Sequence, residues 1–184
     1  MTRATIGTVE AAFFDLDRTI IARSTGLALS RTFMRAGLIP PKTLFGSLFA
    51  GLVFQLMGAD EARMERMRGR AARLTAGWDA QRVRSIVDDV VEEVFSPLIY
   101  AEALELLDRH RESGRVLCIV STSPEEVVHS LARILDVDRC ISTRSRVIGG
   151  VFTGELEFYA FGHRKADAMH AMAAEMKIDL AASY

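Results

Sequence analysis

An apolar run near the start of the chain ends abruptly in two carboxylates. Residues 9–14 favour a short buried strand, and Asp15 and Asp17 follow directly, on either side of Leu16. A strand of this kind is typical of a parallel sheet that is covered by helices on both faces. In open α/β sheets, ligands bind beyond the carboxyl ends of the strands. The feature therefore predicts an α/β fold with a reaction centre at the end of the first strand.

A long helical stretch separates this strand from the next. Residues 24–95 show helical periodicity and no convincing strand, and Asp79 is the predicted N-cap of a helix with valines along one face. Ser96-Pro97 predicts the start of a further helix, and Gly114 predicts its end. The stretch therefore indicates an insertion rather than part of the sheet.

The second predicted strand covers residues 116–120 and ends at Ser121. Residues 123–126, Ser-Pro-Glu-Glu, have the arrangement of a capping box, with Ser123 as the cap. The pattern predicts that a helix begins immediately after Thr122. A tight turn from strand to helix would then lie beside the first strand's carboxylates.

The last part of the chain predicts a hairpin and a helix. Short β-like runs lie on either side of Gly149-Gly150, and Lys165 begins an amphipathic stretch with methionines at helical spacing. Residues 178–184 have the composition expected for the approach to another strand.

Composition limits the classes of function. The chain has 184 residues and a net charge of -1, which suits one compact unit and offers no field for nucleic acid. Cys118 and Cys140 lack the spacing of a zinc site or a disulfide framework, so we expect a reducing, cytoplasmic location. The residues before the acidic motif include one Arg and no long apolar run, so we expect no signal peptide there. Residues 43–59 carry no charge, and we favour a buried or interfacial helix there over membrane contact.

The polar residues, in their order and contexts, resemble the haloacid dehalogenase superfamily of aspartate-nucleophile hydrolases. The first motif is F-F-D-L-D-R-T-I at residues 13–20, a form similar to the branch that contains phosphoserine phosphatase. Ser121 and Lys165 match the second and third motifs, so the resemblance covers nearly the whole chain. It implies a Mg²⁺-dependent phosphatase that acts on a small phosphorylated metabolite.

The resemblance also implies an architecture. The fold class would be α/β, with a Rossmann-like doubly wound parallel sheet and a helical cap inserted after the first strand. Residues 1–23 and 96–184 would form the core, and residues 24–95 would form the cap.

Each motif residue has an implied role. Asp15 would attack phosphorus and become an aspartyl phosphate, and Asp17 would protonate the leaving alcohol. Ser121 and the amide of Thr122, at a helix N-terminus, would bind a phosphoryl oxygen. Lys165 would neutralise the nucleophile and the phosphate.

The metal site is incomplete in this sequence. Asp15 and the carbonyl of Asp17 are the implied ligands of Mg²⁺, which requires several hard oxygens. The family's fourth motif, a pair of acidic residues after a further strand, is absent. We expect the chain to be a fragment of a longer protein, rather than a non-catalytic relative.

Substrate contacts are expected from Thr19 and Ser24. Ser24 occupies the position at which phosphoserine phosphatases have a glutamate that binds the substrate ammonium, so phosphoserine is disfavoured. Arginines that recur at helical spacing in the cap would suit a second acidic group, but we favour a solvated face with ion pairs. These arginines are Arg63, Arg66, Arg70 and Arg73.

Other functions stay open beside a phosphatase. A phosphotransferase would use the same intermediate but pass the group to an alcohol. A non-catalytic module would keep the fold without the metal site. Processing of a lipid phosphate at a membrane is a third alternative, raised by residues 43–59. The sequence carries no signal for oligomeric state.

Overall fold

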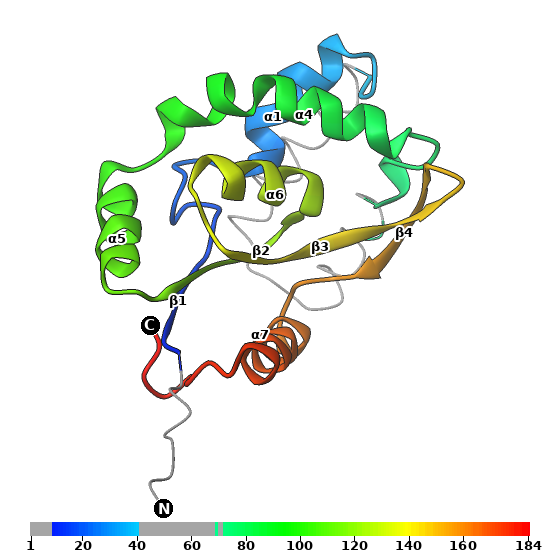
Figure 1. Cartoon of the computed structure of the whole chain (residues 1–184). Coiled ribbons are helices and arrows are strands. Elements are labelled where there is room, and N and C mark those ends of the chain that lie inside the picture. Colours follow the sequence, from blue (N-terminus) through cyan, green and yellow to red (C-terminus); the bar gives the residue numbers. More distant parts are fainter. Residues whose placement is uncertain (1–8, 41–68, 70–71) are drawn as a thin grey trace, which may run out of the picture.

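The computed structural model describes residues 9–40, 69 and 72–184 of the chain. Its elements form a sheet with helices on both sides (Figure 1). In chain order they are β1 (Ala11–Phe14), α1 (Thr25–Arg35), α4 (Ala80–Phe95), the 3-10 helix η1 (Ser96–Leu98), α5 (Ala101–Glu112), β2 (Val116–Pro124), α6 (Glu125–Ile134), β3 (Arg139–Ile148), β4 (Val151–Phe158) and α7 (His163–Met176).

The sheet has four strands in the order β1-β2-β3-β4. The first three are parallel, whereas β4 runs antiparallel to β3 as the second arm of a hairpin. The hairpin turns at Gly149 and Gly150, whose φ angles of 59° and 82° suit the two-residue turn that glycine favours. The predicted α/β fold and the predicted hairpin are confirmed, although the hairpin makes the sheet mixed rather than wholly parallel.

Alternate residues of β2 face opposite sides of the sheet, as strand geometry requires. Leu117 and Ile119 belong to the main hydrophobic cluster, which also contains residues of α4, α5 and α6. Cys118 and Val120 belong to a second cluster with α7. Figure 1 shows α5 and α6 on one side of the sheet and α7 on the other. Because both faces are covered, β2 is apolar at consecutive positions.

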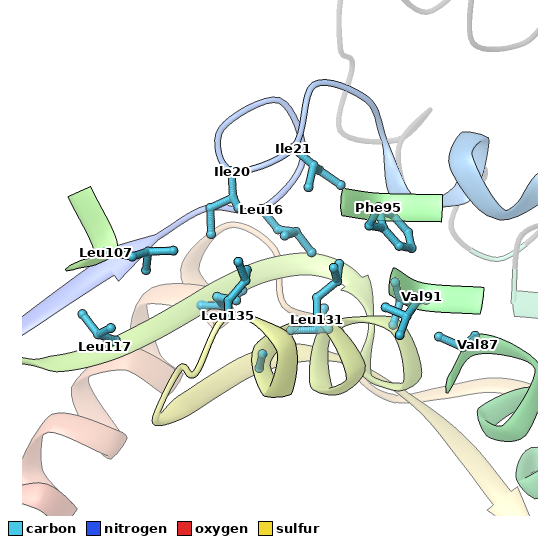
Figure 2. Packing of buried hydrophobic residues seen from close by; sticks show 14 of the residues in the cluster. Leu16, Ile20, Ile21, Val87, Val91, Phe95, Leu107, Leu117, Leu131 and Leu135 are labelled. Atoms are coloured by element: carbon cyan, nitrogen blue, oxygen red, sulfur yellow. The ribbon is translucent and has the colours of Figure 1, made fainter. Parts of the chain in front are cut away.

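Helix α4 begins after Asp79 as predicted. Oδ1 of Asp79 accepts a hydrogen bond from the backbone N–H of Arg82 at 2.7 Å, which satisfies one N–H that has no partner inside the helix. Val87, Val91 and Phe95 lie on one face of α4 and pack into the main cluster (Figure 2). The valine periodicity therefore identified the buried face of this helix.

Polar contacts also join α4 to α6. The hydroxyl of Ser130 and the guanidinium of Arg133 both donate to Oδ1 of Asp88, each at 2.5 Å. Helix α4 thus packs against α6, although the predicted cap, residues 24–95, includes it. The boundary between core and cap stays a prediction.

Helix α5 begins later than predicted. Pro97 lies in the single 3-10 turn η1, and α5 starts only at Ala101. Between the two, Ile99 is extended and forms an antiparallel bridge with Ile21 in the loop after β1. This long-range contact holds the chain out of a helical conformation. The end of α5 is as predicted, because Gly114 follows it with a φ of 72°.

The segment after α7 returns along the side of β1 that faces away from β2. The N–H of Tyr184 donates to the carbonyl of Ala11 at 2.9 Å, and its own carbonyl accepts from the N–H of Phe13 at 2.7 Å. In parallel pairing, one residue typically bonds to two residues of the neighbouring strand in this way. Strand β1 therefore has bonded neighbours on both sides.

Some predictions fall outside the described residues. These are the uncharged stretch 43–59 and the cap arginines Arg63, Arg66 and Arg70. In the part of the chain that the structure describes, no helix combines the length and the hydropathy that a membrane crossing requires.

Candidate active site

Strand β1 delivers two acidic side chains to a turn at its carboxyl end. Between them, Leu16 is fully buried in the main cluster, and its carbonyl accepts the N–H of Ile20 at 3.0 Å. The turn holds Arg18 at a φ of 63°, in the left-handed region that residues other than glycine adopt at a cost. The buried leucine anchors the turn, so Asp15 and Asp17 are placed on either side of it.

Lys165 lies against Asp15, although 150 residues separate them along the chain. Its Nζ is 3.0 Å from Oδ1 of Asp15. Helix α7 begins just before Lys165, after Gly162, whose φ of 56° is readily adopted by glycine. The Asp15 side chain is 46% exposed and that of Lys165 is 27% exposed, so this ion pair adds little stability. Its main effect is to place a cation beside an accessible carboxylate.

The Asp17 carboxylate accepts three hydrogen bonds. Oδ1 accepts from the backbone N–H of Thr25 at 2.5 Å. Oδ2 accepts from the hydroxyl of Ser123 at 2.5 Å and from that of Ser121 at 3.4 Å. Thr25 is the first residue of α1, so the negative charge lies at the positive end of a helix. The structure thus brings together Asp17 and Ser121, two of the predicted site residues.

The residues after position 120 continue β2 instead of starting a helix. Helix α6 begins only at Glu125, and no side chain bonds to its first N–H groups. The predicted capping box is therefore wrong. Ser123 uses its hydroxyl for Asp17, while its N–H donates to Oγ of Ser121 at 3.1 Å. A hydrogen bond to a carboxylate is about twice as strong as a neutral one, so the Ser123 hydroxyl bonds to Asp17 rather than capping a helix.

Thr122 is exposed between the two serines. The sequence predicts that its amide lies at a helix N-terminus, but α6 begins three residues later. The carbonyl of Thr122 accepts from the hydroxyl of Thr143 at 2.7 Å, and that hydroxyl accepts from the N–H of Ala160 at 3.3 Å. Thr143 therefore joins the strand end that contains Ser121 to the segment that leads to Lys165.

The two predicted substrate-binding residues of the first loop lie at its edges. Ser24 is the N-cap of α1, where its carbonyl accepts the N–H groups of Leu27 and Ala28 at 3.1 and 3.0 Å. Thr19 is exposed in the turn after β1. Within the described residues, neither side chain bonds to the acidic pair or to the lysine.

Two residues of this site were not predicted as part of it. Ser123 was interpreted as a helix cap, yet strand alternation places residues 121 and 123 on the same face, which was an available signal. Thr25 had no local signal, because its hydroxyl partner Ser123 is 98 residues away.

Few oxygen donors for a cation are available at this site. Asp15 Oδ1 is paired with Lys165, and both carboxylate oxygens of Asp17 accept hydrogen bonds. Of the oxygens of Asp15 and Asp17, the second carboxylate oxygen of Asp15 and the backbone carbonyl of Asp17 remain as ligands for a cation. In the described part of the chain, no cluster of three or more His, Cys, Asp or Glu residues suits a metal ion. These residues therefore fit only part of a Mg²⁺ shell.

Residues 12–184 match the sequence model of the haloacid dehalogenase-like hydrolases. The chain is 43% identical over 176 residues to the "Inhibition of morphological differentiation protein" of Streptomyces azureus, covering 95% of this chain and 63% of that protein. It is 43% identical over 164 residues to a "Probable phosphatase" of Mycobacterium tuberculosis, covering 89% of this chain and 57% of that protein. The chain therefore spans less than two thirds of the length of these relatives.

Solved structures share the same fold. A protein of unknown function from Bordetella pertussis matches with a TM-score of 0.78 at 19% identity, over 96% of this chain and 79% of that one. A phosphoserine phosphatase with a phospho-aspartyl intermediate analogue matches with a TM-score of 0.62 at 17% identity, over 96% of this chain and 77% of that one. At these identities the likeness concerns the fold alone.

Proposed function

Because this chain belongs to the haloacid dehalogenase-like hydrolases, we propose that the protein is a phosphatase that hydrolyses a small phosphate ester through an aspartyl phosphate. The observation that carries the proposal is the 3.0 Å contact between Lys165 Nζ and Asp15 Oδ1 at the carboxyl end of the parallel strands. A carboxylate without a neighbouring cation repels a phosphate dianion. The ammonium group of Lys165 offsets this repulsion, so a phosphate dianion can approach Asp15.

The reaction has two steps with the same acidic pair. First, a carboxylate oxygen of Asp15 attacks phosphorus, the bond to the leaving oxygen breaks with its electron pair, and that oxygen takes a proton from Asp17. Next, water attacks the aspartyl phosphate and gives a proton to Asp17, while the Asp15 carboxylate leaves with the electrons of its bond to phosphorus. Asp17 ends protonated as it began, so protons and charge balance over the cycle.

The other site residues stabilise the phosphoryl group. Ser121 bonds to Asp17 and lies one strand away from Asp15, so its hydroxyl is suited to contact a phosphoryl oxygen. Lys165 offsets the negative charge that develops on the transferred group. The N–H of Thr122, at the exposed end of β2, is a proposed second donor.

Phosphatases of this family are generally metal-dependent, and we propose Mg²⁺ as the cofactor. Asp15 and the carbonyl of Asp17 would contribute two of its ligands. When bound, the ion supplies positive charge that stabilises the phosphoryl oxygens.

A screen of phosphate esters tests the proposal. The full-length protein should release inorganic phosphate from at least one small ester, and EDTA should lower that rate by about 10-fold or more, with Mg²⁺ restoring it. The readout is phosphate release, with product analysis in the presence of added alcohols. Transfer to the alcohol instead of release would favour the phosphotransferase, and inertness toward every ester would contradict the proposal.

The substrate is proposed to lack an ammonium group next to the ester. Ser24 offers no negative charge at the position where phosphoserine phosphatases have their glutamate. Phosphoserine is therefore expected to be a poorer substrate in the same panel than neutral or anionic esters.

Replacing Asp17 by Asn should lower kcat on alkyl phosphates by about 10²-fold or more, but should affect p-nitrophenyl phosphate less. The alkoxide needs a proton to leave, whereas nitrophenolate is stable without one. Steady-state kinetics of the variant on both substrates measure the difference. Equal losses on the two substrates would contradict the general-acid role.

A cytoplasmic location is proposed from the cysteines. Both are free, and Cys118 is buried in the sheet. Burial raises the pKa of the Cys118 thiol to about 12, with a smaller contribution from Asp138, and burial raises the pKa of Cys140 to about 11. Thiols that stay protonated at neutral pH react slowly with oxidants. The support for a reducing compartment is that the two cysteines form no disulfide.

A further inference from the structure

A chain of buried hydroxyls approaches Asp17 from the protein interior. The Ser123 and Thr25 hydroxyl oxygens are 2.7 Å apart, and Ser123 is in turn 2.5 Å from Oδ2 of Asp17. Ser123 is 7% exposed and Thr25 is 2% exposed. These contacts are therefore shielded from water, which would otherwise compete for the same hydrogen bonds.

The direction of the hydrogen bonds follows from the number of protons. A hydroxyl has one proton to donate, and Ser123 donates its proton to the carboxylate of Asp17. While Asp17 is ionised, Thr25 is therefore the donor in the contact between the two hydroxyls. Because its backbone N–H also donates to Oδ1 of Asp17 at 2.5 Å, Thr25 acts on both carboxylate oxygens, on one directly and on the other through Ser123.

We propose that Ser123 and Thr25 are positioning residues that hold the Asp17 carboxyl group in the orientation for proton transfer. This inference rests on the proposed phosphatase function, in which Asp17 is the acid. Two bonds to different oxygens, one from α1 and one from β2, restrict its rotation about the bond to Cβ. Proton transfer depends on such alignment, since a misplaced acid loses much of its effect.

The location of the two residues links Asp17 to separate parts of the fold. Ser123 belongs to β2, whereas Thr25 is the first residue of α1, beside the loop that leaves β1. The orientation of the proposed acid is therefore set jointly by the sheet and by the start of the first helix after it.

The test compares four variants of the full-length protein on an alkyl phosphate and on p-nitrophenyl phosphate. Ser123→Ala removes the central hydroxyl, and Thr25→Val removes the outer one while keeping the backbone N–H. Thr25→Ser keeps the hydroxyl and should rescue the loss. Ser130→Ala is the matched control, because Ser130 on α6 is also buried and its hydroxyl also donates, at 2.5 Å, to an aspartate, Asp88 of α4.

Ser123→Ala and Thr25→Val should lower kcat on the alkyl phosphate by about 10-fold to 10²-fold, with KM nearly unchanged, and lower it by less than about 3-fold on p-nitrophenyl phosphate. Thr25→Ser should stay close to the wild type on both substrates. Ser130→Ala should lose thermal stability without changing the ratio of the two activities. A merely structural role would reduce both activities together.

Two outcomes would overturn the inference separately from the proposed function. The first is that Ser123→Ala keeps wild-type kinetics, and the second is that the variants lose activity equally on both substrates. In both cases the wild-type protein remains an active phosphatase, so the proposed function stands. If the wild type itself releases no phosphate from any ester, the proposed function fails and this inference fails with it.

Discussion

Replacing Asp15 by Asn should lower kcat for phosphate release by about 10⁴-fold or more. The amide has nearly the shape of the carboxylate, but its oxygen is a poor nucleophile, so no aspartyl phosphate forms. Stability should change by less than about 1 kcal/mol, because the ion pair with Lys165 is partly exposed to solvent. Phosphate release and thermal unfolding of the same preparation measure the two effects.

Asp108→Asn is the matched control for this change. Asp108 also forms an ion pair, with Arg111 on α5, and its side chain is 66% exposed. This variant should keep the wild-type rate. Undiminished hydrolysis by Asp15→Asn would contradict the nucleophile assignment, whereas equal losses in both variants would show a general effect of removing a surface charge.

Replacing Leu131 by Ala should lower the free energy of unfolding by about 2–5 kcal/mol. Leu131 is fully buried on α6 and points toward the residues of α4 and of the β1 turn in the main cluster (Figure 2). The change removes methyl groups and leaves a cavity that the packed helices refill only in part. Since domains of this kind are stable by about 5–15 kcal/mol, the loss is a large fraction of the total.

Leu104→Ala is the matched control, since Leu104 lies on helix α5 but is 43% exposed. It should change stability by less than about 1 kcal/mol. Thermal unfolding measures both variants, and Leu131→Ala should lower Tm by roughly 5–20 °C for a chain of this size. Similar, small shifts in the two variants would contradict the assignment of Leu131 to the core.

Local patterns predicted the elements whose signals lie within a few residues. Asp79 caps α4, Gly114 follows the end of α5, and the glycine pair turns the hairpin. In each case the group that satisfies the backbone is close in sequence, so tertiary contacts had little to change.

Patterns failed where a distant partner competed with a local one. Ser123 has the sequence context of a helix cap, but the carboxylate of Asp17 takes its hydroxyl and β2 continues to Pro124. Pro97 has the context of a helix start, but the bridge between Ile99 and Ile21 keeps the next residues extended. Both errors lie beside the loop after β1, where segments far apart in sequence meet.

The sequence by itself determined the α/β class, the succession of strands and helices, and the motifs that contain Asp15, Asp17, Ser121 and Lys165. It did so because hydrophobic periodicity and turn chemistry act over short distances. Only the tertiary structure decided that Lys165 contacts Asp15, and that Thr25 and Ser123 bond to Asp17. These contacts join residues 8 to 150 positions apart. Their partners are selected by burial and by charge-assisted hydrogen bonding in the folded chain, which no short stretch of sequence encodes.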